Sequence, residues 1–333
     1  MTNETEKPKI PESKNIDKLN EYTYKVGIFR AGLELEIWEK VGNGEDTAEQ
    51  MSAKEGWDPL GTRMLLDDLC SLKLLKKRNN RYRLVKESEY YLIPGKPTYE
   101  GKFLLNDCNW EGNGHLAEAI RTGKRPIYHN ATTNEMVDDW LGVYVPNLLD
   151  EVAYLKMSTE FWKTLGVQAH EGMRVLDVAC GPAPRTLMLA RQHPGVQVTL
   201  LDWERILNTA LGFSRTLGVE KQVTTKLGDL WSTAFGSNHF ELVFLGNITH
   251  FFSSEENTRL FQKVYAALAP GGVIAISAIR REYPHPTGPG LWFYAVSKGG
   301  AAYDFEEYTN MLERSGFTDI KDVAKQPITA VKP

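Results

Sequence analysis

Val175-Leu176-Asp177-Val178-Ala179-Cys180-Gly181-Pro182-Ala183 is the segment of this 333-residue chain that says most about its architecture. It reads as a short apolar strand that runs into small residues, and residues 185–192 then predict a helix. A second apolar strand, residues 198–201, ends at Asp202, 25 positions after Asp177. A carboxylate at the end of that strand can accept hydrogen bonds from both ribose hydroxyls of a nucleoside. The segment therefore predicts a βαβ unit that binds an adenosine-type cofactor.

The composition is that of an ordinary soluble globular protein, with 42% hydrophobic and 25% charged residues, and the length fits two domains or one large one. A net charge of -4 argues against nucleic-acid binding, which normally requires a basic domain. Cys70, Cys108 and Cys180 are scattered and odd in number, so we expect no metal site and a reduced, cytoplasmic setting. Residues 1–17 lack the apolar core of a signal peptide, and no run in the sequence approaches 18 apolar residues, so we expect no membrane partner.

The N-terminal part of the chain predicts helices followed by a hairpin. Residues 1–17 are polar and rich in Lys, Glu and Pro, which predicts a disordered leader. Apolar residues recur at helical spacing over residues 18–41, and Thr47 and Asp58 can each cap a further helix. Residues 74–85 then predict a β-hairpin.

Three helices followed by a hairpin are typical of a winged helix, and we assign residues 18–98 to such a mainly helical domain. DNA binding is one function of this fold. However, the third helix carries Asp67 and Asp68 where a phosphate-facing surface needs Lys or Arg. We therefore interpret the domain as a dimerisation module.

The rest of the chain predicts linker helices over residues 99–168 and an α/β domain over residues 169–333. In the latter, strands and helices alternate, which predicts a Rossmann-like parallel sheet with helices on both faces. Gly-x-Gly-x-x-Gly is absent from the first loop, so NAD is disfavoured.

Two later predicted strands also end at polar residues, in Lys226-Leu227-Gly228-Asp229-Leu230 and in Glu241-Leu242-Val243-Phe244-Leu245-Gly246-Asn247. They place Asp229 and Asn247 at the carboxyl edge of the sheet, where ligands bind in open α/β folds. Asp229 could hold an adenine amine, with Leu230 and Trp231 against the ring. A helix end, a turn and a buried strand follow over residues 268–276.

In this order, the segments from residue 174 to 333 resemble the class I S-adenosylmethionine (SAM)-dependent methyltransferases. With the N-terminal region added, the chain is similar to the small-molecule O-methyltransferase family, which includes the acetylserotonin, plant phenolic and bacteriochlorophyll enzymes. Further local matches are His115-Leu116-Ala117-Glu118-Ala119-Ile120-Arg121-Thr122-Gly123 and the terminal Ala330-Val331-Lys332-Pro333. The resemblance implies a SAM-dependent enzyme acting on a small-molecule acceptor, and a homodimer whose first domain helps to form the acceptor pocket.

The resemblance also implies which residues bind SAM. The cofactor-binding residues would be Asp177, Gly181, Asp202, Trp203, Asp229, Leu230 and Asn247. Among them Asp202 would bind the ribose, Asp229 with Leu230 would flank the adenine, and Asn247 would lie near the methionine end. The family usually has Gly-x-Gly-x-Gly in the first loop, where this chain has Ala179, Gly181 and Ala183.

Methyl transfer from a sulfonium is an in-line displacement, so the protein mainly aligns the acceptor and excludes water. His250 matches the position where many O-methyltransferases have the His that removes the acceptor's hydroxyl proton, and it is our candidate catalytic residue. The alternative is a packed core histidine. The family's orienting carboxylate falls on Ala278, so the pairing of His and acid is incomplete.

The resemblance favours a hydroxyl oxygen as the acceptor atom, whereas the incomplete pairing of His and acid weakens the case for it and leaves two kinds of alternative. A thioether sulfur needs no base, so an S-methyltransferase of the methylthio-hydroxybutyrate type, on the way to dimethylsulfoniopropionate, is one alternative. Arg280 and Arg281 would then bind the acceptor carboxylate. A SAM-sensing winged-helix regulator and an inactive methyltransferase fold are alternatives of other classes. The candidate acceptor-binding residues are Trp110, Tyr128, His129, Tyr144, Asn147, Met157 and Arg280.

Overall fold

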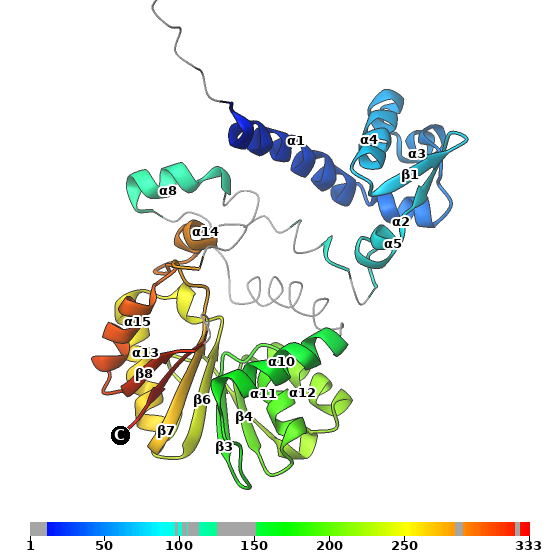
Figure 1. Ribbon diagram of the computed structural model, residues 1–333. Helices are drawn as coiled ribbons and strands as arrows, with labels where there is room; N and C mark the ends of the chain where they lie inside the picture. Colours follow the sequence, from blue (N-terminus) through cyan, green and yellow to red (C-terminus); the bar gives the residue numbers. More distant parts are fainter. Residues whose placement is uncertain are drawn as a thin grey trace, which may run out of the picture. The chain divides into compact units, whose positions relative to one another are not determined.

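The computed structural model (Figure 1) describes residues 12–96, 99–101, 105, 113–124, 151–283, 289–323 and 327–333. The chain divides into two compact units, Met1–Leu105 and Asn106–Pro333. No helix among the described residues is long and apolar enough to cross a membrane.

In the described residues, the first unit consists of one long helix, several shorter helices and a β-hairpin. Its elements are α1 (Lys14–Glu34), α2 (Ile37–Gly42), α3 (Ala48–Glu55), α4 (Pro59–Ser71), β1 (Leu75–Arg78), β2 (Arg81–Leu84) and α5 (Lys86–Tyr91). The predicted caps are confirmed, because Thr47 accepts a hydrogen bond from Gln50 N and Asp58 accepts one from Gly61 N. The predicted helix over residues 18–41 is instead two helices, since the backbone at Glu36 is left-handed, with φ 53°.

The helix α1 also begins earlier than expected, at Lys14, so the last residues of the predicted leader are helical. The hairpin is held to α4 by Asp67, whose Oδ1 accepts hydrogen bonds from Tyr82 Oη at 2.8 Å and from Lys77 Nζ at 2.7 Å. Tyr82 is almost fully buried in the core of the unit, together with Trp38. The helix α4, predicted as the third helix of the unit, thus uses an acidic residue to fix the hairpin.

The second unit is built on a seven-stranded sheet with the order β5-β4-β3-β6-β7-β9-β8. The strands are β3 (Arg174–Val178), β4 (Gln197–Asp202), β5 (Val223–Leu227), β6 (Phe240–Gly246), β7 (Leu268–Ser277), β8 (Thr318–Asp322) and β9 (Pro327–Val331). The first five are parallel, as predicted, whereas β9 is antiparallel to both β7 and β8. The short connection between β8 and β9 explains this departure, because neighbouring strands that are joined by a few residues must run antiparallel.

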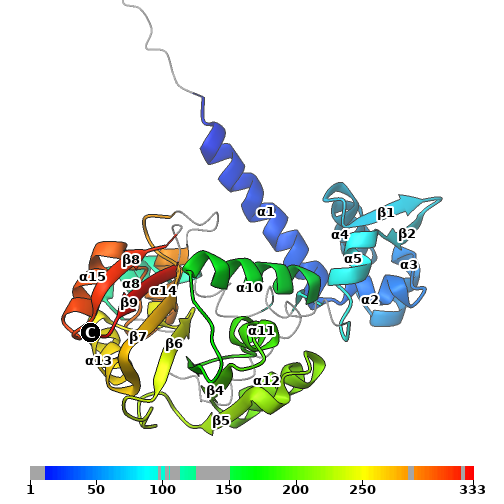
Figure 2. The same cartoon turned by 60° about the horizontal axis from the view of Figure 1, so that its bottom comes forward.

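Helices cover both faces of this sheet, as Figures 1 and 2 show for the green helices on one side and the yellow and orange helices on the other. The helices of the first group are α10 (Glu151–Leu165), α11 (Pro184–Gln192) and α12 (Glu204–Thr216), and those of the second are α13 (Ser254–Ala267) and α15 (Phe305–Glu313). Successive residues of β3 serve the two cores, because Val175 packs with the first group and Leu176 with the second. Two further α-helices among the described residues of this unit are α8 (Leu116–Thr122) and α14 (Pro289–Val296).

Candidate active site

The loop after β3 keeps a left-handed backbone at alternate positions. Ala179, Gly181 and Ala183 have φ values of 52°, 56° and 55°. This region suits glycine, because a Cβ approaches the following carbonyl oxygen there. The chain therefore adopts the backbone that a Gly-x-Gly-x-Gly loop would favour, although two of the three residues are alanine. A Cβ built on Gly181 would meet no atom within 4 Å, so open space lies beside the loop.

Asp202 connects this loop to the end of β4. Its Oδ2 accepts a hydrogen bond from Gly181 N at 3.0 Å, and its Oδ1 accepts one from Trp203 N at 2.8 Å. The carboxylate is only 9% exposed, and burial raises its pKa to about 6, although the two backbone hydrogen bonds act to lower it. The structure thus brings together three of the residues predicted to bind the cofactor.

Asp177 lies behind the same loop and is fully enclosed. Its Oδ2 accepts a hydrogen bond from Thr186 Oγ1 at 2.5 Å. Burial raises the pKa of Asp177 to about 8, and the nearby Asp202 carboxylate adds to the effect. At neutral pH the site therefore holds one protonated and one ionised carboxyl group, which limits the repulsion between them.

Asp229 stands at the head of a tight turn after β5. Its Oδ1 accepts hydrogen bonds from Trp231 N at 2.8 Å and from Ser232 N at 3.2 Å. Gly228 N donates to Asp202 O at 3.1 Å, so this turn begins beside the end of β4. Leu230 is buried in the core on the α13 side of the sheet. The carboxyl ends of β3, β4 and β5 thus form one continuous edge, as predicted.

Asn247 and His250 follow β6, the neighbour of β3 on its other side. Asn247 is exposed, has a φ of 56°, and donates its backbone N–H to Ser277 O at 2.7 Å. His250 lies in a 3-10 turn, Thr249–Phe251, and is 2% exposed. The two residues therefore continue the same edge, but only Asn247 is open to solvent.

His250 is enclosed by aromatic rings. Its ring centroid lies 4.0 Å from that of Phe293 on α14 and 4.7 Å from that of Phe251. Burial lowers the pKa of His250 to about 3, so the ring is neutral at physiological pH. Its Nδ1 is buried, and no described residue forms a hydrogen bond with it.

The backbone around His250 is held firmly in place. Thr249 Oγ1 forms a 2.6 Å hydrogen bond with Tyr308 Oη, and Asn257 Nδ2 donates to Thr249 O at 2.8 Å. A Cβ on Gly300 would lie 2.2 Å from His250 O, so the glycine lets a second segment pack directly against this turn. Packing and backbone contacts therefore fix the position of the imidazole. Among the described residues, no carboxylate forms a hydrogen bond with its Nδ1.

The structure corrects the expectation that Arg280 binds an acceptor carboxylate. Its guanidinium is 1% exposed and donates through Nη2 to both Asp322 oxygens, at 2.8 and 2.9 Å. Glu282 lies 3.2 Å from its Nη1. Arg281 forms ion pairs with Asp304 and Glu307. Both arginines are thus paired with carboxylates of the chain itself, an outcome that no local sequence pattern indicated.

The other predicted acceptor-binding residues cannot be placed. Trp110, Tyr128, His129, Tyr144 and Asn147 lie outside the described residues. Met157 lies on α10, in the part of the helix whose side chains are not described.

Two residues that the sequence analysis did not single out join this edge of the sheet. Thr186 holds Asp177, as described above. Arg185 donates to Ser277 Oγ at 3.0 Å, and its guanidinium carbon lies 4.5 Å from the Phe161 ring centroid. Arg185 and Thr186 could have been found from the sequence by their position directly after the first loop.

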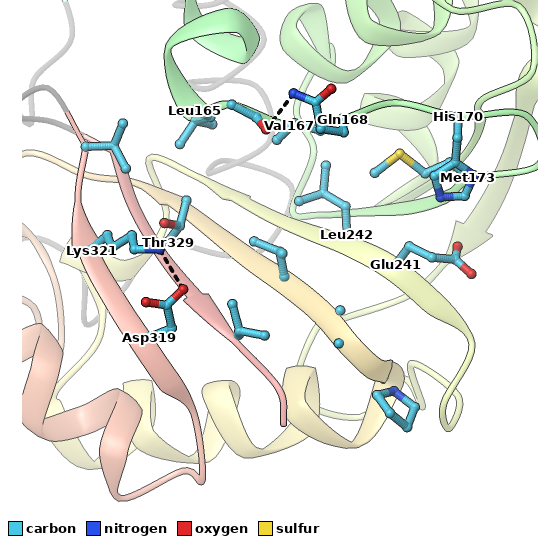
Figure 3. Close-up of a pocket in the computed structure, with 17 residues that line it drawn as sticks. Leu165, Val167, Gln168, His170, Met173, Glu241, Leu242, Asp319, Lys321 and Thr329 are labelled. Atoms are coloured by element: carbon cyan, nitrogen blue, oxygen red, sulfur yellow. Dashed lines mark hydrogen bonds and ion pairs between the residues drawn. The ribbon is translucent and has the colours of Figure 1, made fainter.

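A separate hollow of about 460 Å³ lies at the opposite edge of the sheet (Figure 3). Its lining includes Met173, Glu241 and Gly272, at or near the amino ends of three strands. The ion pair between Lys321 and Asp319 lies on its β8 side. Because ligands of open α/β sheets bind at the carboxyl ends of the strands, we do not assign the cofactor to this hollow.

Comparison with known proteins relates this edge to a family. Residues 175–272 match the family model of a methyltransferase domain. The chain is 24% identical over 315 residues to 3-hydroxy-5-methyl-1-naphthoate 3-O-methyltransferase of Streptomyces sahachiroi, with 90% of this chain and 88% of that protein covered. It is 24% identical over 267 residues to acetylserotonin O-methyltransferase of Mus musculus, with 74% and 67% covered.

Solved structures share the fold over almost the whole chain. Human N-acetylserotonin methyltransferase in complex with SAM gives a TM-score of 0.67 at 21% identity, covering 97% of this chain and 99% of that one. An O-methyltransferase from neocarzinostatin biosynthesis, in complex with SAM and 2-hydroxy-5-methyl naphthoic acid, gives 0.70 at 17% identity, covering 92% and 95%.

The fold and the edge built from Asp177, Gly181 and Asp202 define a class I SAM-dependent methyltransferase. Within that class, the chain is similar to small-molecule O-methyltransferases, including the acetylserotonin enzymes. The residues present suit SAM, because the open space beside Gly181 faces a loop whose backbone is already tied to a carboxylate. Among the described residues, no cluster of His, Cys, Asp and Glu could hold a metal ion.

Proposed function

We propose that this protein transfers the methyl group of SAM to a hydroxyl oxygen of a small aromatic acceptor. The observation that carries the proposal is the hydrogen bond from Gly181 N to Asp202 Oδ2, which joins the ends of β3 and β4. The loop that carries His250 starts from β6, directly beside β3. Relatives that act on hydroxynaphthoate and on acetylserotonin support a phenolic acceptor.

In this proposal, bound SAM supplies an electrophilic methyl group, and the residues of the chain hold and orient the two reactants. Asp202 accepts hydrogen bonds from the ribose hydroxyls, and Asp229 with Leu230 holds the adenine. Gly181 lines the methionine and ribose side, with Asp177 supporting its loop from behind, Trp203 beside the ribose and Asn247 at the methionine end. Residues 169–333 would form the SAM-binding domain, and the acceptor pocket would include the linker of residues 99–168.

His250 would act on the acceptor hydroxyl. A neutral imidazole can accept a hydrogen bond from that hydroxyl and so orient the oxygen toward the methyl group. Its low pKa makes it a weak base, so proton uptake would occur late, as the new C–O bond forms. The exclusion of water by the surrounding aromatic rings would favour the same step.

Isothermal titration with SAM and with S-adenosylhomocysteine (SAH) tests the cofactor site. We expect the wild type to bind both and Asp202→Ala to bind at least tenfold more weakly, because two hydrogen bonds to a charged group are lost. Wild-type protein that binds neither compound would refute the proposal. SAH formation with 3-hydroxy-5-methyl-1-naphthoate or N-acetylserotonin as acceptor would then separate an enzyme from a SAM-sensing regulator.

The ion pair between Arg280 and Asp322 also favours an oxygen acceptor over a carboxylated thioether. The alternative of a carboxylated thioether depended on Arg280 and Arg281 binding the acceptor carboxylate, and both are paired with carboxylates of the chain. A methylthio-carboxylate acceptor in the same assay should therefore give no SAH above background.

We further propose a cytoplasmic homodimer formed through residues 18–98. The support is the set of exposed apolar residues on α1, among which Leu19 and Val26 are 67% and 48% exposed. Light scattering on the purified protein should give twice the mass of the chain. A monomer at micromolar concentration would contradict this part of the proposal.

A further inference from the structure

The turn that would hold the adenine is fixed at its amino end by Asp229. Besides the two hydrogen bonds to Oδ1, Thr233 N donates to Asp229 O at 2.9 Å, which closes a single helical turn. A Cβ on Gly228 would lie 2.1 Å from Thr233 Oγ1, so the turn folds back onto the strand that precedes it. No described residue donates to Asp229 Oδ2, which is therefore the oxygen left for an exocyclic amine.

Lys263 of α13 fixes the other end of the same turn. Its Nζ donates to Trp231 O at 2.8 Å, to Thr233 O at 3.1 Å and to Leu230 O at 2.5 Å. Since an ammonium group has three protons, all three are used on carbonyls of one turn. The Nζ also lies 4.4 Å from the ring centroid of Phe235. Burial lowers the pKa of Lys263, and the nearby Asp229 carboxylate opposes that effect.

The three carbonyl groups require this cation. Their oxygens converge on one ammonium group, and without that donor they would repel one another and lose three charge-assisted hydrogen bonds. The turn would then have to open, which would move Leu230 and Asp229 together because both belong to it.

The helix α13 also connects this turn to the loop of His250. Asn257, six residues before Lys263 on the same helix, donates to the carbonyls of Thr249 and Phe252. Six residues span about 9 Å of helix. One rigid helix therefore sets both the turn assigned to the adenine and the turn that carries the imidazole.

We propose that Lys263 is a positioning residue for the cofactor, which acts by holding the carbonyls of Leu230, Trp231 and Thr233 so that Asp229 and Leu230 can receive the adenine. This inference rests on the proposed function. It adds a residue that does not touch SAM and that lies outside the motifs of the sequence.

Replacement of Lys263 by Met keeps the length of the side chain and removes the ammonium group. We expect Lys263→Met to bind SAH about tenfold more weakly than the wild type in isothermal titration at pH 7. Lys263→Arg retains the charge, but its planar donors can reach only part of the three carbonyls, so we expect about threefold weaker binding. If Lys263→Met does not fold, the Arg variant decides the question, because unchanged SAH affinity in it would overturn the proposal.

Lys332 offers a matched control. Its Nζ donates to Asn238 Oδ1 at 2.7 Å and to the carbonyls of Tyr265 and Leu268 at 2.8 Å each, at the amino end of β7. Lys332→Met should lower the melting temperature as Lys263→Met does, yet leave SAH affinity within twofold of wild type. Equal losses of SAH affinity in both variants, or none in Lys263→Met, would overturn the inference. Failure of the wild type to bind SAH would instead refute the proposed function itself.

Discussion

SAH binding should weaken about tenfold between pH 7 and pH 5 because of Asp202. Burial raises the pKa of this carboxyl to about 6 in the free protein, so it is about 90% ionised at pH 7 and about 9% ionised at pH 5. Only the ionised carboxylate of Asp202 can accept hydrogen bonds from the ribose hydroxyls through both of its oxygens. At pH 5 the carboxyl group must therefore lose its proton before SAH can bind in this way. Asp177, with a pKa of about 8, stays protonated throughout this range, and the amino and carboxyl groups of SAH titrate outside it.

The same raised pKa affects the stability of the free protein. An acid whose folded pKa lies above its unfolded value of 3.8 stabilises the fold below pH 4 and loses that contribution as pH rises to about 6. The loss amounts to about 3 kcal/mol. Bound SAH should offset part of it, so the cofactor should raise the melting temperature more at pH 7 than at pH 5.

Isothermal titration at pH 5, 6 and 7, in two buffers of different ionisation enthalpy, measures both the affinity and the proton released. Asp202→Asn is the control, since an amide cannot titrate, and its weaker affinity should not change over this range. A wild-type affinity that is flat from pH 5 to 7, or an equal slope in Asp202→Asn, would refute the reasoning.

Three further predictions concern single side chains. His250→Ala should lower kcat about 100-fold while SAH affinity stays within twofold. Because the pKa of His250 is about 3, the wild-type rate should not fall as the pH is lowered through 6.5. A fall in the wild-type rate near pH 6.5 that is missing in His250→Ala would contradict this prediction. Arg280→Ala should lower the free energy of unfolding in urea by about 3 kcal/mol, since Asp322 loses its buried partner, and a change below about 1 kcal/mol would be inconsistent with that contact. Ala183→Gly should raise the melting temperature slightly and the free energy of unfolding by up to about 1 kcal/mol, because glycine accepts a φ of 55° without strain. A lower melting temperature would show that Ala183 is not strained.

Much of the fold follows from local sequence patterns. The caps at Thr47 and Asp58 and the polar ends of β4 and β5 are set by neighbouring residues, so spacing along the chain is enough to find them. The antiparallel β9 was missed because alternation of strands and helices does not report the direction of the last strand.

The surroundings of individual side chains were less predictable. The ring against His250 comes from Phe293, 43 residues further along, and the partner of Arg280 is Asp322, 42 residues away. Such contacts depend on how separate helices and strands pack, and they leave no periodic signal in the sequence. Lys263 was missed for the same reason, since its three acceptors lie about 30 residues before it.

The two outer strands of the sheet, β5 and β8, bear on how the protein avoids aggregation. A bare strand edge offers unpaired backbone groups to any other chain that can add a strand. β8 is short and exposes charged side chains, among them Asp319 and Lys321, while β5 exposes Thr224 and Thr225. Charges on a short edge strand disfavour the addition of a foreign strand, because its approach would desolvate them. Replacing Asp319 and Lys321 by valine would thus create an edge that favours strand addition, without changing any residue of the active site.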